Sequence, residues 1–208
     1  MVTMTPSANL RARWLDVLLP NIVFDGWTDA AAIAAAETAG LSPGEQALAA
    51  PRGIIDLIDH IFDEAEASAR ATISETDLTG LGVRDKVVFG LNAWLTALEP
   101  NREAVRKAAM KGFLPWMASD AVQRTWSIAD MIWTATGDTS EDYNKYSKRG
   151  LLAATIPLII LKWVDEENKD RMDAYIAARL TGAMRLGRAG GIVAKPILGA
   201  LERLSRKD

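Results

Sequence analysis

The spacing of apolar residues constrains the fold of this chain more than any other feature of its sequence. Apolar side chains recur at helical spacing throughout the 208 residues, and no stretch sustains the alternation of a half-buried strand. The chain breakers are single glycines and prolines rather than the paired turn residues of hairpins. The pattern therefore predicts an all-α protein, a single-domain bundle of about nine or ten helices.

Capping residues and breakers place the ends of these helices. Thr28 and Ser42 can cap the free amides of the helices that follow them, and Glu45 completes a capping box with Ser42. Pro20 is expected to end the first helix, and Pro157 to kink or split a later one, because proline lacks an amide donor and clashes with the preceding turn. The predicted helices cover residues 8–19, 28–39, 42–50, 54–74, 84–98, 101–112, 116–136, 141–164 and 168–188, and a last one follows Gly190 and Gly191.

The sequence offers little for catalysis. His60 is the single histidine, so it cannot supply the two Glu-x-x-His pairs of a helical di-iron site, and the acidic residues beside it, Asp56, Asp59, Asp63 and Glu66, are interpreted as a solvated helix face. No nucleophile elbow, phosphate loop or dinucleotide fingerprint is present. We therefore expect no catalytic residue, no metal site, no cofactor and no enzymatic activity.

Composition points to a reducing compartment. The chain has no cysteine, and residues 1–10 lack the features of a secretory or organelle leader. The longest apolar run, Gly150 to Leu161, has 12 residues, whereas a helix needs about 20 to span a bilayer. A cytoplasmic protein, peripheral on the inner face of the membrane, is expected.

The first three predicted helices, with a tight Gly40-Leu41-Ser42 turn, resemble a helix-turn-helix, and the number and order of helices resemble the TetR family. DNA binding needs basic side chains for the phosphates. From Trp14 to Glu66, however, the chain has ten acidic residues and one basic residue, Arg52. We expect no binding of nucleic acid, although a TetR-like regulator with a hydrophobic effector is kept as the alternative.

Tryptophan is unusually frequent among the aromatic residues, with seven tryptophans against four phenylalanines and three tyrosines. Trp126 and Trp133 are seven residues apart and share one helix face. They are either ordinary core or the wall of an apolar cavity, which in a bundle lies between helices. Large flat rings and pliable methionine suit a polyprenyl lipid. The predicted lipid-binding residues are Trp94, Trp126, Met131 and Trp133.

The end of the chain is basic and amphipathic. Residues 179–208 carry a net charge of +5 against −3 for the whole chain, so the other 178 residues carry −8. Such a helix can lie in an anionic membrane interface or pack on a second copy. The predicted membrane-binding residues are Ile197, Leu198, Leu201, Leu204, Lys195, Arg203 and Arg206. We divide the chain into a degenerate helix-turn-helix region (1–52), a lipid-binding and dimerisation body (53–189) and a hinge with the last helix (190–208).

Several spaced groups of residues are specific when taken together. They include Phe24-Asp25-Gly26-Trp27-Thr28, Thr125-Trp126 with Ala129-Asp130-x-Ile132-Trp133, and above all Gly137-Asp138-Thr139-Ser140-x-Asp142-x-Asn144-x-Tyr146-Ser147-Lys148-Arg149. In these groups the chain resembles the Coq-nine family of ubiquinone (coenzyme Q) biosynthesis accessory proteins, across nearly its whole length.

The resemblance implies a TetR-like fold without DNA binding, a lipid cavity, a membrane-binding last helix and homodimerisation. It also implies that an isoprenoid quinone intermediate is presented to the di-iron demethoxyubiquinone hydroxylase. Lys145 stands where family members usually carry tryptophan, so either the partner surface is remodelled or the partner has changed. A structural dimer joined by the last helix is a third reading. The predicted partner-binding residues are Asp142, Asn144, Tyr146, Lys148 and Arg149.

Overall fold

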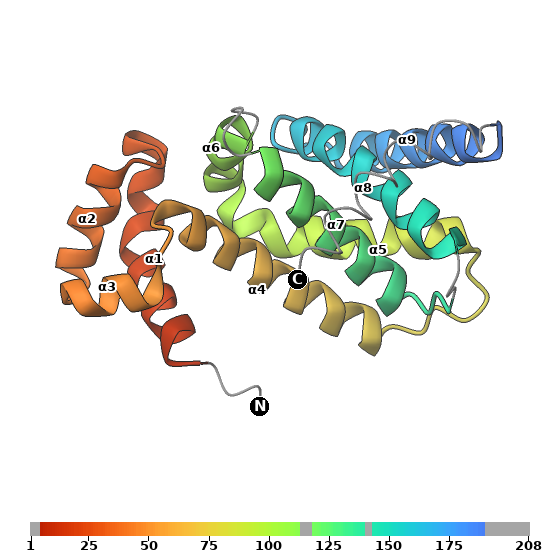
Figure 1. The fold of residues 1–208 in the computed structure, drawn as a ribbon. Coiled ribbons are helices and arrows are strands. Elements are labelled where there is room, and N and C mark those ends of the chain that lie inside the picture. Colours follow the sequence, from red (N-terminus) through yellow and green to blue (C-terminus); the bar gives the residue numbers. More distant parts are fainter. Residues whose placement is uncertain (1–4, 113–117, 140–142, 190–208) are drawn as a thin grey trace. The chain divides into compact units, whose positions relative to one another are not determined.

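The computed structural model describes residues 5–112, 118–139 and 143–189. These ranges are helical and contain no strand, so the all-α prediction is confirmed for them, and the number of helices is close to the number predicted (Figure 1). The predicted helix after Gly190 lies outside the described residues. The helices are α1 (Pro6–Asp25), α2 (Asp29–Thr38), α3 (Pro43–Ala49), α4 (Ile54–Glu75), α5 (Val83–Leu98), α6 (Arg102–Gly112), α7 (Ala118–Ala135), α8 (Tyr143–Trp163) and α9 (Lys169–Ala189), with a short 3-10 helix at Glu99–Asn101.

The predicted caps form at the starts of α2 and α3. The hydroxyl of Thr28 accepts a hydrogen bond from the amide of Ala31. Ser42 and Glu45 form a full capping box, in which the Glu45 carboxylate accepts from the Ser42 amide at 2.8 Å and from its hydroxyl at 2.7 Å. Gly40, at a φ of 68°, makes the turn between the two helices. This part of the chain follows local sequence rules closely.

The capping box makes a testable electrostatic prediction. The Ser42 side chain, and then its amide, hold the pKa of Glu45 below its ordinary value of 4.5. The stability contributed by this carboxylate is therefore present above pH 4.5 and lost as pH falls through the lowered pKa. In Ser42→Ala, NMR titration should show the Glu45 pKa raised toward 4.5. Ser74→Ala is the control, because the Ser74 hydroxyl donates to the carbonyl oxygen of Ala71 and is not part of the capping box. An unchanged pKa of Glu45 in Ser42→Ala would refute the assignment.

The expectation for Pro20 is wrong, and that for Pro157 is wrong in one of its two alternatives. Pro20 does not end α1, which continues to Asp25. The residues around it explain this, because Leu18 and Ile22 are 1% and 0% exposed and their packing outweighs the local disruption. The side-chain amide of Asn21 also donates to a carbonyl oxygen of the preceding turn at 3.0 Å. Pro157 was expected to kink or split its helix; it lies inside α8, which is not split there.

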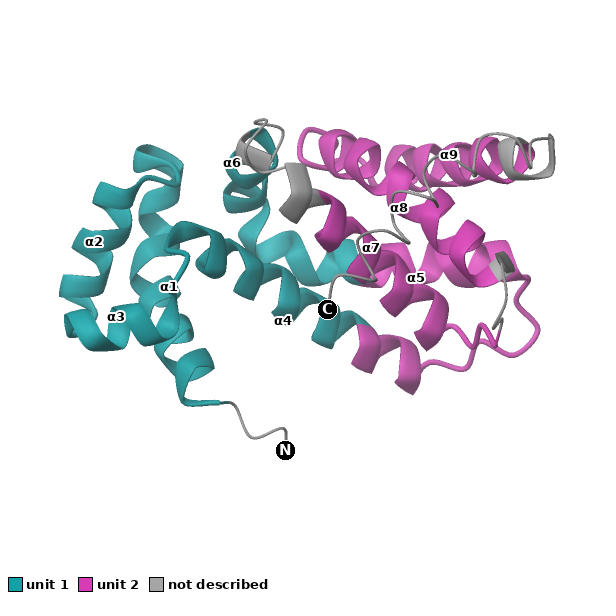
Figure 2. Ribbon diagram, in the orientation of Figure 1, with its two compact units in different colours: residues 1–69, 94–118 teal, residues 70–93, 119–208 magenta. Residues whose placement is uncertain are grey.

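The chain forms two compact units, and α4 and α5 each contribute residues to both (Figure 2). Unit 1 comprises Met1–Ala69 and Trp94–Ala118, and unit 2 comprises Arg70–Ala93 and Ser119–Asp208. The boundaries predicted after residues 52 and 189 concern function and stay predictions.

In unit 1, α1 packs against α2, α3 and α6. Two buried tryptophans connect these helices through their indole N–H groups. Trp14 donates to the carbonyl oxygen of Ala32 at 2.8 Å, and Trp27 donates to that of Ala104 at 2.9 Å. Each ring thus contributes apolar area and also satisfies its own donor.

The acidic face predicted for α4 is wrong at one residue. Asp56 is buried, and its carboxylate accepts from the Arg52 amide at 2.7 Å and from Arg52 Nε at 2.8 Å. Arg52 also reaches Asp59 at 2.6 Å. Asp56 therefore caps the turn before α4 rather than facing solvent. His60 is buried at the edge of the core, with its Nε2 atom 3.2 Å from Glu64.

In unit 2, α8 packs along α9, and buried aliphatic side chains of α7, α8 and α9 form the core. Gly90 allows α5 to approach α7, since a Cβ atom there would lie 2.8 Å from Cγ2 of Ile132. Asn92 donates to Asp173 of α9 at 2.8 Å. None of the described helices combines the length and hydropathy needed to cross a bilayer.

Candidate functional site

A glycine turn ends α7 and brings a carboxylate back beneath the helix. Gly137 has a φ of 87° and its amide donates to the Thr134 carbonyl at 3.1 Å, while the Asp138 amide donates to the Trp133 carbonyl at 2.9 Å. These two bonds form a Schellman motif with glycine at the position that needs a left-handed conformation. The Asp138 side chain is 7% exposed as a result.

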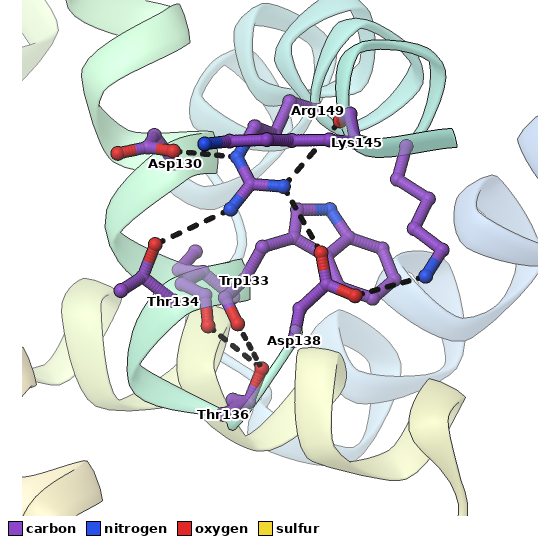
Figure 3. A network of polar contacts seen from close by, with 9 residues as sticks. Asp130, Trp133, Thr134, Thr136, Asp138, Lys145 and Arg149 are labelled. Atoms are coloured by element: carbon purple, nitrogen blue, oxygen red, sulfur yellow. Dashed lines mark hydrogen bonds and ion pairs between the residues drawn. The ribbon is translucent and has the colours of Figure 1, made fainter. Parts of the chain in front are cut away.

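Arg149 of α8 connects that carboxylate to α7 (Figure 3). Its guanidinium is buried and contacts Asp138 at 3.0 Å, Asp130 at 2.5 Å and the Thr134 hydroxyl at 3.3 Å. It also donates to the carbonyl oxygen of Lys145 at 3.4 Å. A buried arginine needs such partners, because an unpaired charge in the interior is strongly unfavourable.

Lys148 lies beside Arg149 in the same network. Its ammonium group is 2.9 Å from Asp138 and 5.3 Å from the centroid of the Trp133 ring, which is a cation–π arrangement. Two cations from α8 thus share Asp138, the carboxylate that the α7 turn has buried. We call this set, Asp130, Asp138, Lys148 and Arg149, the corner network.

Beside the corner network, two aromatic rings stack across α7 and α8. The rings of Trp126 and Tyr146 have centroids 6.4 Å apart and an interplanar angle of 23°. Gly150, one turn after Tyr146, lies beside the indole, since a Cβ atom there would touch Trp126 at 3.9 Å, an ordinary van der Waals contact. Tyr146 is 51% exposed. The pair is therefore held in place and partly open to solvent.

The structure places the predicted partner-binding residues in different environments. Tyr146 is exposed and Lys148 is partly exposed, whereas Arg149 is 2% exposed and satisfied inside unit 2. Arg149 thus has a structural role that the sequence did not indicate. Asp142 and the Asn144 side chain lie outside what the structure describes.

The predicted lipid-binding residues fall in both units. Trp126, Met131 and Trp133 lie on α7 in unit 2, where Met131 and Trp133 are buried and Trp126 is half-buried. Trp94 lies on α5 in unit 1, fully buried, with its ring centroid 6.2 Å from that of Phe62. The indole N–H groups of Trp94 and Trp133 have no hydrogen-bond acceptor within the described part of the chain. Their role in lipid binding stays a prediction.

Asp130 and Asp138 stand in the quoted motifs, but no role was predicted for either of them. The available signal was their charge, because Asp130 follows the buried Ala129 in an otherwise apolar helix segment. The predicted membrane-binding residues, Lys195 to Arg206, lie outside the described residues. In the ranges that the structure covers, no group of three or more His, Asp or Glu side chains is arranged to hold a metal ion.

Fold and site together define an all-α protein with a rigid corner between α7 and α8. Residues 118–187, which contain this corner, match the COQ9 family model. The chain is 26% identical over 187 residues to the human protein named ubiquinone biosynthesis protein COQ9, mitochondrial, covering 86% of this chain and 58% of the human one. It is 24% identical over 172 residues to a probable COQ9 protein of Dictyostelium discoideum, covering 80% and 56%.

The resemblance inferred from the motifs is thus confirmed, and the chain is related to the COQ9 proteins. Rat COQ9 gives a similar match, with 25% identity over 187 residues, 86% of this chain and 60% of the rat one. The chain spans somewhat less than two thirds of the length of these curated relatives.

Proposed function

We propose that this chain is an accessory protein of ubiquinone biosynthesis, which binds an isoprenoid quinone intermediate and presents it at the membrane to the di-iron demethoxyubiquinone hydroxylase. The observation that carries this proposal is the COQ9 match over residues 118–187, because that segment contains the corner network and the Trp126–Tyr146 stack. The chain itself performs no chemistry in this proposal. It acts as a homodimer on the inner face of the membrane.

Lipid binding is supported by the chemistry of the aromatic residues. Trp94, Met131 and Trp133 present large, polarisable apolar surfaces, which suit an isoprenoid chain. The indole N–H group of Trp133, which has no acceptor among the described residues, can also donate to an oxygen substituent of a bound head group. Apolar tail and oxygenated head together correspond to a prenylated quinone precursor.

Extraction and mass spectrometry of the lipid that co-purifies with the protein test this proposal directly. Near-stoichiometric polyprenylated quinone precursor is expected from protein isolated with its native membranes. The control is the same extraction from Trp133→Ala protein shown by circular dichroism to be folded, in which the yield should fall. Folded wild-type protein without any lipid would contradict the proposal.

Membrane attachment is proposed for the last segment. Leu201 and Leu204 fall on the apolar side of its helical wheel, and Lys195, Arg203 and Arg206 on the other side. Replacing both leucines with glutamate should abolish co-sedimentation with anionic vesicles, because it removes apolar burial and adds like charge at the surface. Circular dichroism should be unchanged. Co-sedimentation equal to that of the wild type would refute this attachment site.

A further inference from the structure

The connection between α4 and α5 exposes apolar side chains. Residues 76–82 form this connection, and Val83 begins α5. Leu81 is 43% exposed, Val83 is 58% exposed, and Leu78 is half-buried beside them in the sequence. We call residues 76–83 the apolar loop. Single exposed aliphatic side chains are ordinary, but several in one short surface segment mark a site of interaction.

The apolar loop has a defined shape and satisfies part of its own backbone. The Leu81 amide donates to the Leu78 carbonyl at 3.2 Å across a β-turn in which Gly80 has a φ of 85°. The Thr79 amide donates to the Asp77 carboxylate at 2.8 Å. Because these amides have acceptors within the loop, the segment can enter apolar surroundings at a lower desolvation cost than an open loop.

The apolar loop lies in the same unit as α9 and next to it. Arg84, directly after the loop, donates from its guanidinium to the Ala177 carbonyl of α9 at 3.4 Å. Figure 1 shows the loop between α4 and α5 and the end of α9 at the same end of unit 2. The chain continues from that end of α9 into residues 190–208, the segment proposed to bind the membrane.

Positive charge at this end of unit 2 comes from α9. Residues 76–86 are neutral, because two acidic side chains balance two basic ones. Residues 177–189 of α9 include three arginines and no acidic residue, and two of these, Arg179 and Arg185, are exposed. Exposed aliphatic side chains near a basic helix end are the composition of an interfacial membrane contact.

We propose that the apolar loop is a second membrane contact of unit 2, which inserts Leu81 and Val83 into an anionic lipid surface. This inference rests on the proposed membrane attachment of the last segment. The occupant is a lipid surface because the loop adjoins the arginine-rich half of α9, from which that segment follows. Two contacts on one unit bind more strongly than either alone, since the first raises the effective concentration of the second. They also fix the orientation of unit 2 on the membrane.

Leu81→Ser combined with Val83→Ser tests the apolar part of this contact without changing charge. Both side chains are exposed, so the unfolding midpoint should stay close to that of the wild type. Binding to phosphatidylcholine vesicles that contain phosphatidylserine should weaken about tenfold, since two aliphatic side chains no longer enter the lipid. Val23→Ser combined with Ile33→Ser, at positions 49% and 52% exposed, is the matched control and should bind as the wild type does.

A fluorescent probe at the loop reports insertion directly. The chain has no cysteine, so Val83→Cys provides a single attachment site for a polarity-sensitive dye. When the protein binds vesicles, emission from residue 83 should brighten and shift to the blue, because the dye leaves water for the lipid interface. Lys169→Cys is the control, since the native side chain is 78% exposed at the start of α9, and its dye should stay in water.

The outcomes separate this inference from the proposed function. Wild-type protein that does not bind the vesicles would overturn the proposed attachment and the inference with it. Vesicle-bound protein whose dye at residue 83 stays in water would overturn the inference alone, as would equal vesicle affinity of the loop variant and the wild type. A dye shift that appears without vesicles and grows with protein concentration would assign the apolar loop to a second copy of this chain, which also overturns the inference.

Discussion

Arg149→Ala is expected to lower the free energy of unfolding by about 3 kcal/mol, the lower end of what removing one member of a buried ion pair does. The substitution leaves the buried Asp138 carboxylate without its arginine, although Lys148 stays 2.9 Å away and limits the loss. Urea denaturation followed by circular dichroism measures this change. The midpoint should fall with little change in slope, because the folded state retains its helices.

The two aspartates of the network provide the control. Asp130 is 48% exposed, and an ion pair with a carboxylate that accessible contributes up to about 1 kcal/mol. Asp130→Asn should therefore have a small effect, whereas Asp138→Asn should approach that of Arg149→Ala. Equal losses for both asparagine variants would show that burial of Asp138 is not the source of the stability.

The same variant should also affect binding. Arg149 donates to the Lys145 carbonyl in the first turn of α8, so its loss releases the turn that carries Lys145 and Tyr146. Under the proposed function, affinity for the hydroxylase should therefore decrease in Arg149→Ala even where the protein is folded. Arg149 would then be a residue that positions the first turn of α8.

Local rules predicted much of the fold. The helix predicted over residues 84–98 forms as α5, and its side chains at helical spacing are buried (Val87, Leu91, Trp94, Leu95 and Leu98), with Val88 half-buried beside them. The start of α3 could be predicted from the Ser42–Glu45 capping box, because the two residues satisfy the free amides of the first turn. Both features depend on residues within a few positions of each other.

The errors came from contacts that sequence spacing does not show. Pro20 was expected to end α1, but the burial of Ile22 against the rest of unit 1 decides that the helix continues. Asp56 was assigned to a solvated face because its neighbours on the wheel are acidic, yet Arg52 folds over it. In each case tertiary packing outweighed a local preference.

In the candidate site, too, local sequence patterns were predictable and tertiary contacts were not. The motif residues from Gly137 to Arg149 were identified from the sequence as a group, but their roles were not. The burial of Arg149 depends on the turn at Gly137, which brings Asp138 back under α7, and this geometry has no signature in helical periodicity. Lys145, by contrast, was identified from the sequence as a departure from the family pattern.

Gly90→Val is expected to destabilise the protein by about 2 to 3 kcal/mol through overpacking between α5 and α7. A Cβ atom at residue 90 would lie 2.8 Å from Ile132 and 3.5 Å from Ile73, and both isoleucines are buried. Gly182→Val is the matched control, because a Cβ atom at that exposed position of α9 meets nothing within 4 Å. That control should be neutral, and Gly182→Ala should stabilise by about 0.5 to 1 kcal/mol through the lower entropy of the unfolded chain.

The Gly90→Val variant also tests the corner network, because Ile132 precedes Trp133 on α7. If valine at residue 90 displaces α7, the Trp133 ring should move relative to Lys148, and the near-ultraviolet circular dichroism of the tryptophans should change. Thermal or urea unfolding gives the stability, and the spectrum gives the displacement. Loss of stability without a spectral change would place the strain in α5 instead, while equal stability of Gly90→Val and Gly182→Val would show that the close approach of α5 and α7 is not required.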